Sequence, residues 1–343
     1  MRYFCLVLIV TMFTIIKGTG QDAECLFNHL YSYDSVSITL TFPFDSLQKT
    51  RQDEIEGRVD IRSEQGNLIV DEPIKIGLRG KFRRMNCVMP PLMLNFRKSM
   101  LKEMGFNNHD DIKLVTHCLD TEEGEENLLE ERLCYLLYQS LTPYAYRTAW
   151  VTVRYQDISD PNVFMDKKGF LIEPDKDLED RLSVVETNRF NPPEDSVDFE
   201  SYSKTVAFNF LIGNRDWSVV MARNAKLFYD AKKGKFVVIP YDFDYSNIVG
   251  ASYRKTVLWE GLKHPNDRIY FGEYFSDRAA EILQGFSQTE NGILHRIMAS
   301  PGNLSEKQRK KIRTYCETWY KYIQTRKTKD LAFEMIMPYK GGL

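Results

Sequence analysis

The sequence predicts an α+β protein with a strand-rich first part and a mainly helical second part. Between residues 35 and 82, three runs alternate polar and apolar residues, which is the period of a strand with one buried face. In residues 122–140, leucines recur every three or four positions, which is the spacing of an amphipathic helix. A second such pattern follows Ser305, a favourable N-cap residue. We therefore expect an antiparallel sheet with one helix, followed by supporting helices.

The first twenty residues are typical of a secretory signal peptide. Arg2 precedes an apolar run that is too short to cross a bilayer, and small residues lie before Gln21. We expect cleavage near Gly20 and export to the periplasm, the cell surface or the extracellular space; a retained anchor is the alternative. No later apolar run is long enough for a membrane, so we expect no integral membrane segment after cleavage.

Composition indicates a globular chain. The 343 residues include 43% hydrophobic and 13% aromatic residues, which is enough for a substantial core. Lysine and arginine number 46 and acidic residues 48, so the chain lacks the basic field that a dedicated nucleic-acid binder needs. We expect no nucleic-acid partner.

Six cysteines are present, one of them in the predicted signal peptide. Cys87 and Cys118 each adjoin a predicted strand, and an exported protein can keep a disulfide, so this is the favoured pair. Cys134 lies among helical leucines and is expected to be a buried free thiol. The pairing of Cys25 and Cys316 stays open. With no CxxC motif and scattered histidines, nothing indicates a zinc site.

The stretch from 208 to 245 is the most informative part of the chain. An apolar helix is expected to end at Gly213, because glycine adopts the left-handed C-cap conformation without steric cost. A loop with Asp216 follows. Two β-rich runs, 225–230 and 235–242, come next and meet at a turn around Gly234, which predicts a hairpin.

Symmetric pairing about that turn sets Asp230 opposite Phe236 and, further out, Asn224 opposite Asp242. Asp216 would then lie on the loop that enters the hairpin. Oxygen ligands grouped in this way suit Mg²⁺, and a further aspartate could orient a hydroxyl for phosphoryl transfer. The alternative is that these residues serve only loop and cap conformations, where Asp and Asn are common.

Three motifs in this stretch, LIGNRDW, RNAKLFYD and IPYDFDYS, resemble the catalytic segment of the CotH family of secreted kinase-like proteins. The resemblance extends from about residue 74 to about residue 274. It implies a two-lobed, atypical protein-kinase-like fold, with a β-rich N-terminal lobe over 21–173 and a mainly helical C-terminal lobe over 174–343. It also implies ATP with Mg²⁺ or Mn²⁺ as cofactors.

By this resemblance Asp216 is the catalytic residue, and Asn224 and Asp242 hold the metal. Asp244 is either a second ligand or a structural acid, and we favour the structural role. Glu131 would pair with a lysine or a metal, the alternative being an exposed helical acid. Glu173 would line the cofactor site, because residues 170–173 take the place of the kinase hinge.

The resemblance also assigns groups that contact phosphate. Arg79 and Lys81 flank a glycine at a strand end, as cations near a triphosphate would. The family usually carries a lysine on the next strand, where this chain has Met93. Lys98 or Lys113 could substitute, which leaves open a pseudokinase that lacks this lysine.

The leading hypothesis is therefore an exported, ATP- and Mg²⁺-dependent kinase that transfers phosphate to a hydroxyl of a protein substrate. The main alternative is a catalytically weak, kinase-like structural protein of a coat or surface assembly. A third possibility is transfer of AMP, with the triphosphate bound in the opposite direction. The oligomeric state and the acceptor protein are not indicated by the sequence.

Overall fold

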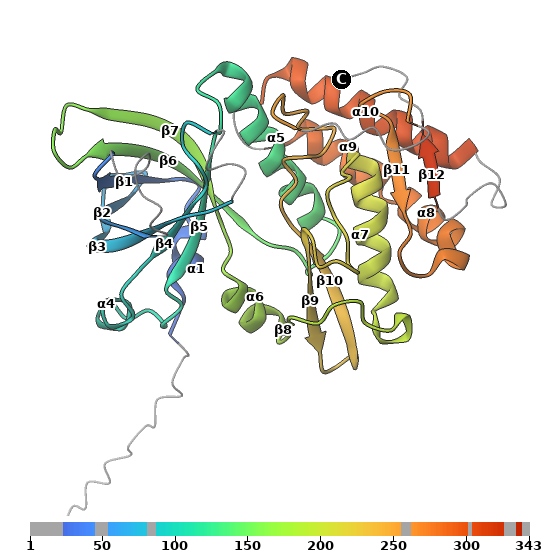
Figure 1. The fold of residues 1–343 in the computed structure, drawn as a ribbon, viewed down its shortest axis with the longest axis horizontal. Coiled ribbons are helices and arrows are strands. Elements are labelled where there is room, and N and C mark those ends of the chain that lie inside the picture. The colour runs from blue at the N-terminus through green and yellow to red at the C-terminus, as the bar shows by residue number, and fades with distance from the viewer. Residues whose placement is uncertain are drawn as a thin grey trace, which may run out of the picture.

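The computed structural model describes residues 23–44, 54–80, 87–254, 262–300, 304–325 and 334–337. The predicted signal peptide and Lys81 lie outside these ranges. Figure 1 shows a strand-rich half and a helix-rich half, with α5 and the β9–β10 hairpin lying on the side of the helical half that faces the strands.

The strands of the first half close into a barrel in the order β1-β2-β3-β4-β5-β7-β6 (Figure 1). The barrel strands are β1 (Val36–Phe42), β2 (Glu54–Ser63), β3 (Leu68–Leu78), β4 (Leu92–Asn95), β5 (Asp111–Thr116), β6 (Thr148–Asp157) and β7 (Phe164–Ile172). Neighbours are antiparallel except β1 and β6, which are parallel, with Val36 beside Val151. Alternating burial fills the barrel with aliphatic residues such as Ile38, Val59 and Ile76.

The predicted two-lobed kinase-like fold is wrong, because β1 joins β2 on one side and β6 on the other and so closes the barrel. An open antiparallel sheet would keep two edges, whereas closure removes them. The alternation in the sequence marks strands correctly, but it carries no information about which distant strands pair.

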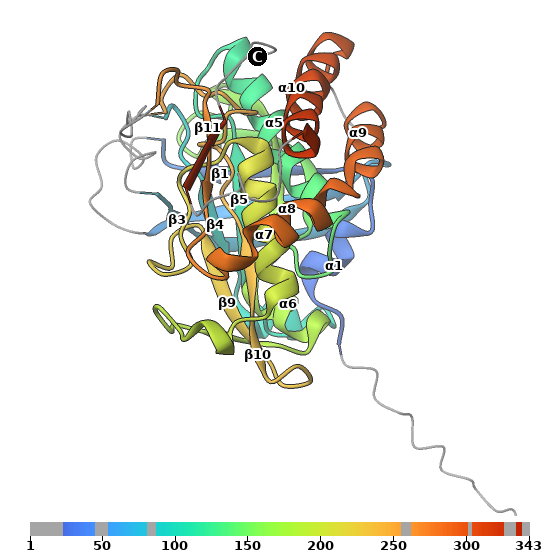
Figure 2. The same cartoon turned by 90° about the vertical axis from the view of Figure 1, so that its right-hand side faces the viewer.

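Helices, a three-stranded sheet and a two-stranded sheet form the second half, which Figure 2 shows from another side. The helices of the described chain are α1 (Leu26–Tyr31), α4 (Lys98–Glu103), α5 (Glu122–Gln139), α6 (Asp175–Leu182), α7 (Phe199–Ile212), α8 (Ala279–Ser287), α9 (Glu290–Met298) and α10 (Glu306–Thr325). Short 3₁₀ turns cover Glu194–Ser196 and Ser276–Arg278. The remaining strands are β8 (Val185–Thr187), β9 (Ala225–Asp230), β10 (Lys235–Pro240), β11 (Arg268–Phe271) and β12 (Glu334–Met337).

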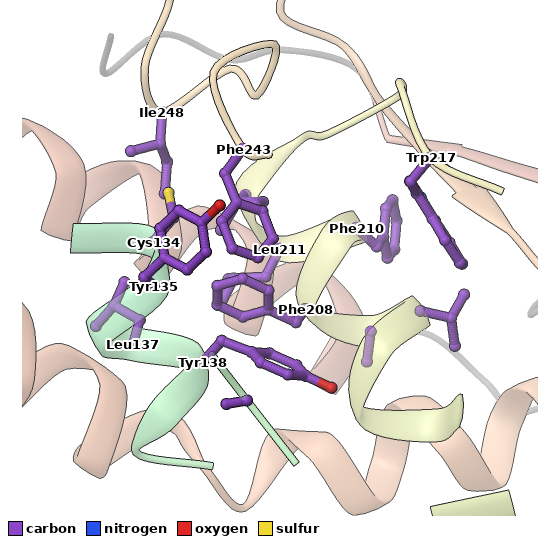
Figure 3. Packing of buried hydrophobic residues seen from close by; sticks show 14 of the residues in the cluster. Cys134, Tyr135, Leu137, Tyr138, Phe208, Phe210, Leu211, Trp217, Phe243 and Ile248 are labelled. Atoms are coloured by element: carbon purple, nitrogen blue, oxygen red, sulfur yellow. The ribbon is translucent and has the colours of Figure 1, made fainter. Parts of the chain in front are cut away.

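Aromatic side chains from α5 and α7 form the centre of the helical half (Figure 3). Phe243 lies between Tyr135 and Phe208, with ring centroids 4.8 and 5.6 Å away. On α10, the face predicted to be apolar is buried, including Trp319, and the Ser305 hydroxyl accepts the N–H of Gln308 as an N-cap. This core fixes the segments that carry the candidate site.

The hairpin register differs by one residue from the prediction. Asp230 pairs with Lys235 and not with Phe236. The carboxylate of Asp230 accepts the N–H groups of Lys232 and Lys233, and Gly234 has a left-handed φ of 64°, so the turn is one residue shorter than a symmetric reading assumes.

The predicted disulfide between Cys87 and Cys118 is present. Cys134 is a buried free thiol, as predicted, and Cys25 and Cys316 are also free and buried. Residues 176–197 contain most of α6, all of β8 and a 3₁₀ turn. In the described part of the chain, no helix combines the length and the hydrophobicity needed to cross a membrane.

Candidate functional site

A cavity of about 270 Å³ lies where the barrel meets the helical half. Its lining comes from the segment after β3, the residue before β4, from β5 and α5, the segment before β6, the end of β7 and the segments around the β9–β10 hairpin. The lining residues are Arg79, Gly80, Pro91, Lys113, Val115, Glu131, Tyr135, Tyr146, Ile172, Asp216, Asn224, Tyr241, Asp242, Asp244 and Tyr245. Seven candidate residues from the sequence therefore meet in one cavity, namely Arg79, Lys113, Glu131, Asp216, Asn224, Asp242 and Asp244.

Asp216 is placed by a chain of side-chain amides that starts on α7. The α7 helix ends at Gly213, which has the predicted left-handed φ of 67°. Asn209 donates to the carbonyl of Thr205 and accepts from the amide of Asn214 at 2.9 Å. Asn214 in turn accepts the N–H of Asp216 at 3.0 Å. Asp216 is thus tied to a buried helix end, although it lies on a loop.

Asn224 contacts Asp216 directly. Its side-chain amide donates to the Asp216 carbonyl oxygen at 2.7 Å and to the Asp216 carboxylate at 3.0 Å. Asn224 and Asp242 both have left-handed backbones, with φ of 49° and 60°. Such conformations are uncommon in residues other than glycine and are concentrated at functional sites.

The left-handed backbones of Asn224 and Asp242 explain why the two residues still lie together, although the predicted hairpin register is wrong by one residue. In the observed register, Tyr241 donates its N–H to the carbonyl of Asn224, so Asp242 lies one position beyond it. In a regular hairpin this one-residue shift would send Asp242 to the other face. Both residues instead leave the strand geometry, and both side chains reach the cavity.

Asp242 is held by the aromatic core. Its N–H donates to the hydroxyl of Tyr135 at 2.9 Å, and the next residue, Phe243, is buried against the Tyr135 ring (Figure 3). The segment around Asp242 is therefore anchored to α5.

The carboxylates of this end of the cavity disfavour each other. Burial raises the pKa of Asp216, and the negative charge of Asp242 raises it further, against the opposing effects of Arg223 and Asn224. Arg223 Nε lies 3.4 Å from the Asp216 carboxylate. A cation bound between these acids would relieve that repulsion.

Cationic side chains also line the cavity. Lys113 on β5 is nearly buried and lies 3.1 Å from the carboxylate of Asp175, which also accepts the hydroxyl of Tyr146 at 2.6 Å. Burial lowers the pKa of Lys113; Asp175 opposes this shift, and the positive charges of Lys226 and Arg79 add to it. Although burial alone would raise it, the pKa of Asp175 falls to about 2 beside Lys113 and Lys226.

The structure distinguishes the two lysines left open by the sequence. Lys113 on β5 pairs with Met93 on the neighbouring strand β4, so the two side chains project from the same face of the sheet. Lys113 therefore lies beside the position where the family usually carries a lysine. Lys98 is on α4, its side chain is 54% exposed, and its Nζ lies 3.6 Å from the carboxylate of Asp110. Lys113 is the one that lines the cavity.

Three further acids have different surroundings. Glu131 is buried and lines the cavity, so it is not the exposed helical acid of the alternative. Asp244 also lines the cavity and accepts the hydroxyl of Tyr253 at 3.2 Å. Glu173 is fully buried and forms ion pairs with Arg147 and Arg181, so the structure does not bring it to the cavity with the others.

Sequence reasoning missed Asp175 and Tyr146, which hold Lys113. Asp175 is the third residue after the end of β7 and the first residue of α6. The sequence carries little signal for it, because the lysine that it neutralises lies on a distant strand.

No group of three or more His, Cys, Asp or Glu residues within the described ranges is arranged to hold a metal ion. A metal here would take Asp242 and Asn224 as protein ligands together with oxygens of a bound phosphate, which is the usual mode for Mg²⁺. A scan against protein-family models found no match for the chain, and a search of curated proteins found none either.

Proposed function

We propose that the chain is an exported phosphotransferase that uses ATP with Mg²⁺ or Mn²⁺ and transfers phosphate to a hydroxyl of a protein substrate, as the CotH resemblance implies. The observation that carries this proposal is that basic and metal-binding side chains line a single cavity. Lys113 and Arg79 line it together with Asp216, Asn224 and Asp242. The proposal concerns the activity and not the kinase-like fold, which the closed barrel rules out.

The two sets of side chains suit different parts of a metal–nucleotide complex. Lys113 and Arg79 would bind phosphate oxygens, since charge-assisted hydrogen bonds to phosphate are strong. Asp242 and Asn224 would hold the metal, and the repulsion that raises the pKa of Asp216 supports a bound cation nearby. When bound, the ion neutralises charge on the phosphates during transfer.

Asp216 would orient the acceptor hydroxyl and take its proton. Its N–H is fixed by Asn214 and its carboxylate by Asn224, so the group is held in position before any substrate arrives. The raised pKa of Asp216 suits a general base, because a base works best when its pKa approaches the working pH.

The disulfide between Cys87 and Cys118 supports an exported protein, since disulfides persist in oxidising compartments. We propose that the protein is exported to the periplasm, the cell surface or the extracellular space. An exported phosphotransferase would meet its protein acceptor there.

The test has two stages. Wild-type protein should show a rise in melting temperature with ATP and Mg²⁺ together, because a ligand that binds only the folded state stabilises it. Asp216→Asn keeps the shape of the side chain and should retain this shift, while its transfer of ³²P from ATP to protein falls by about 10²–10⁴-fold.

Two results would overturn the proposal. One is wild-type protein with no nucleotide-dependent shift, which favours the structural-protein alternative. The other is Asp216→Asn with unchanged transfer. Mass spectrometry of the modified protein separates added phosphate from added AMP.

A further inference from the structure

We propose that Glu273 is a positioning residue that holds the loop between Asp216 and Asn224 in its working shape. This inference rests on the proposed phosphotransferase function. Residues 217–223 form a tight loop, closed by two backbone hydrogen bonds between Ser218 and Arg223, at 2.8 and 2.9 Å. The two ends of this loop carry the residues that would orient the acceptor and hold the metal.

The hydrogen bonds within the loop do not satisfy all of its N–H groups. Ala222 has a left-handed φ of 46°, and Met221 is 68% exposed. Val219, in contrast, is buried, so an N–H without an acceptor there would carry the full penalty of desolvation. Something outside the loop must accept its inward-facing N–H groups.

Glu273 supplies these acceptors. One carboxylate oxygen accepts the N–H of Val219 at 2.6 Å and that of Val220 at 3.3 Å. The other accepts the hydroxyl of Ser218, and that hydroxyl accepts the N–H of Met221 at 3.0 Å. One carboxylate therefore organises four consecutive residues of the loop.

Glu273 is itself anchored on α7, the helix that positions Asp216. The next residue, Tyr274, donates its N–H to the hydroxyl of Tyr202 on α7 at 2.9 Å. Asp216 is tied to the end of α7 through Asn214. Asp216 at the start of the loop and Glu273 outside it are therefore both held by the buried helix α7. This arrangement keeps Asn224 within hydrogen-bond distance of Asp216.

Asp230 offers a matched control in the same part of the fold. Its carboxylate also accepts two backbone N–H groups, from Lys232 and Lys233, and one hydroxyl, from Tyr144. It lies at the closed end of the β9–β10 hairpin, whereas Asn224 lies at the open end. Replacing either acid removes the same kinds of bonds, but only one supports the candidate site.

The experiment compares Glu273→Ala, Glu273→Gln and Asp230→Ala in the full chain. Glu273→Ala should lower kcat about 10- to 100-fold with little change in the KM for ATP, because the lost geometry lies at the acceptor and metal end and not at Lys113. Glu273→Gln keeps a carbonyl oxygen for the two N–H groups and should recover most of the activity. Asp230→Ala should lose similar thermal stability and keep its kcat.

A second readout does not need activity. Amide hydrogen exchange at residues 217–224 should increase in Glu273→Ala and stay at the wild-type level in Asp230→Ala. If wild type shows no transfer at all but this exchange pattern appears, the proposed function fails while the anchoring role of Glu273 stands. Unchanged exchange at 217–224 in Glu273→Ala, or an equal loss of kcat in Asp230→Ala, would overturn the inference.

Discussion

The side-chain amide of Asn224 donates to both the carbonyl oxygen and the carboxylate of Asp216, at 2.7 and 3.0 Å. The two residues are separated by a loop, yet their relative position is set by direct contact. If Asn224 also binds the metal, its loss affects the metal and the base together. We expect Asn224→Gly to lower kcat/KM about a hundredfold or more, measured as transfer of ³²P from ATP.

Glycine is the informative replacement because Asn224 has a φ of 49°. Asn224→Gly tolerates that backbone, whereas Asn224→Ala adds about 1 kcal/mol of strain. The glycine variant should therefore unfold at a higher temperature than the alanine variant, while both show the same loss of kcat/KM. Full activity in Asn224→Gly would show that the backbone and not the amide matters.

Lys113 and Lys98 provide a matched pair of lysines. Lys113→Met should weaken ATP binding at least tenfold, because a nearly buried cation at the phosphate end is lost. Lys98→Met removes an exposed lysine beside Asp110 and should leave the Kd for ATP unchanged. Calorimetric titration with ATP and Mg²⁺ measures both. Equal Kd values for ATP in the two variants would show that Lys113 does not bind ATP.

Arg223 controls the pH at which Asp216 loses its proton. Its positive charge opposes the burial that raises the pKa of Asp216, so Arg223→Gln should raise that pKa further. Because a general base must be deprotonated, the acidic limb of the kcat/KM profile should move to higher pH. Arg58→Gln is the control, since the Arg58–Asp71 pair has the same side-chain exposures, 51% and 37%, away from the cavity. A profile in Arg223→Gln that stays in place or moves to lower pH contradicts the role of Asp216.

Asp175 should contribute to stability in a defined pH range. Its pKa is lowered to about 2 in the folded protein, against about 3.9 in an unfolded chain, which corresponds to roughly 2–3 kcal/mol. This contribution is present above the unfolded value and is lost as the pH falls towards 2. Asp175→Asn should therefore unfold with a flatter pH dependence between about pH 4 and 2, as followed by denaturant titration.

At neutral pH the same variant should lose about 3 kcal/mol, because Lys113 and Lys226 lose a buried counter-charge. Asp166→Asn breaks the exposed pair with Arg154 and should cost less than about 1 kcal/mol. If the two variants lose the same free energy of unfolding, the ion pairs of Asp175 with Lys113 and Lys226 do not stabilise the protein more than an exposed pair does.

The sequence predicted what depends on neighbouring residues. The end of α7 at Gly213, the apolar face of α10 and the hairpin turn near Gly234 follow from local pattern, and the structure contains each of them. The grouping of Asp216, Asn224 and Asp242 was also predicted, although by a register that is off by one residue. Left-handed backbones at Asn224 and Asp242 have no signal in a strand pattern, so the reason for the grouping could not be foreseen.

What the sequence missed or left open depends on contacts between distant segments. It left Lys98 and Lys113 as alternatives at the strand position of Met93, and only the pairing of Met93 with Lys113 on the neighbouring strand separates them. Glu173 was assigned to the cofactor by its place at the end of β7, yet it is buried with Arg147 and Arg181. Closure of the barrel through β1 and β6 is the same kind of contact, and it overturned the predicted fold.

That closure has a consequence for how the chain folds. The strands β1 and β6 are far apart along the chain, so the barrel cannot be completed until β6 has left the ribosome. Until then one edge of β1 stays unpaired. Bringing β1 and β6 together costs a large amount of chain entropy before the stabilising contacts between them form. We therefore expect the barrel to form late and slowly, with its first strands exposed to mispairing during synthesis.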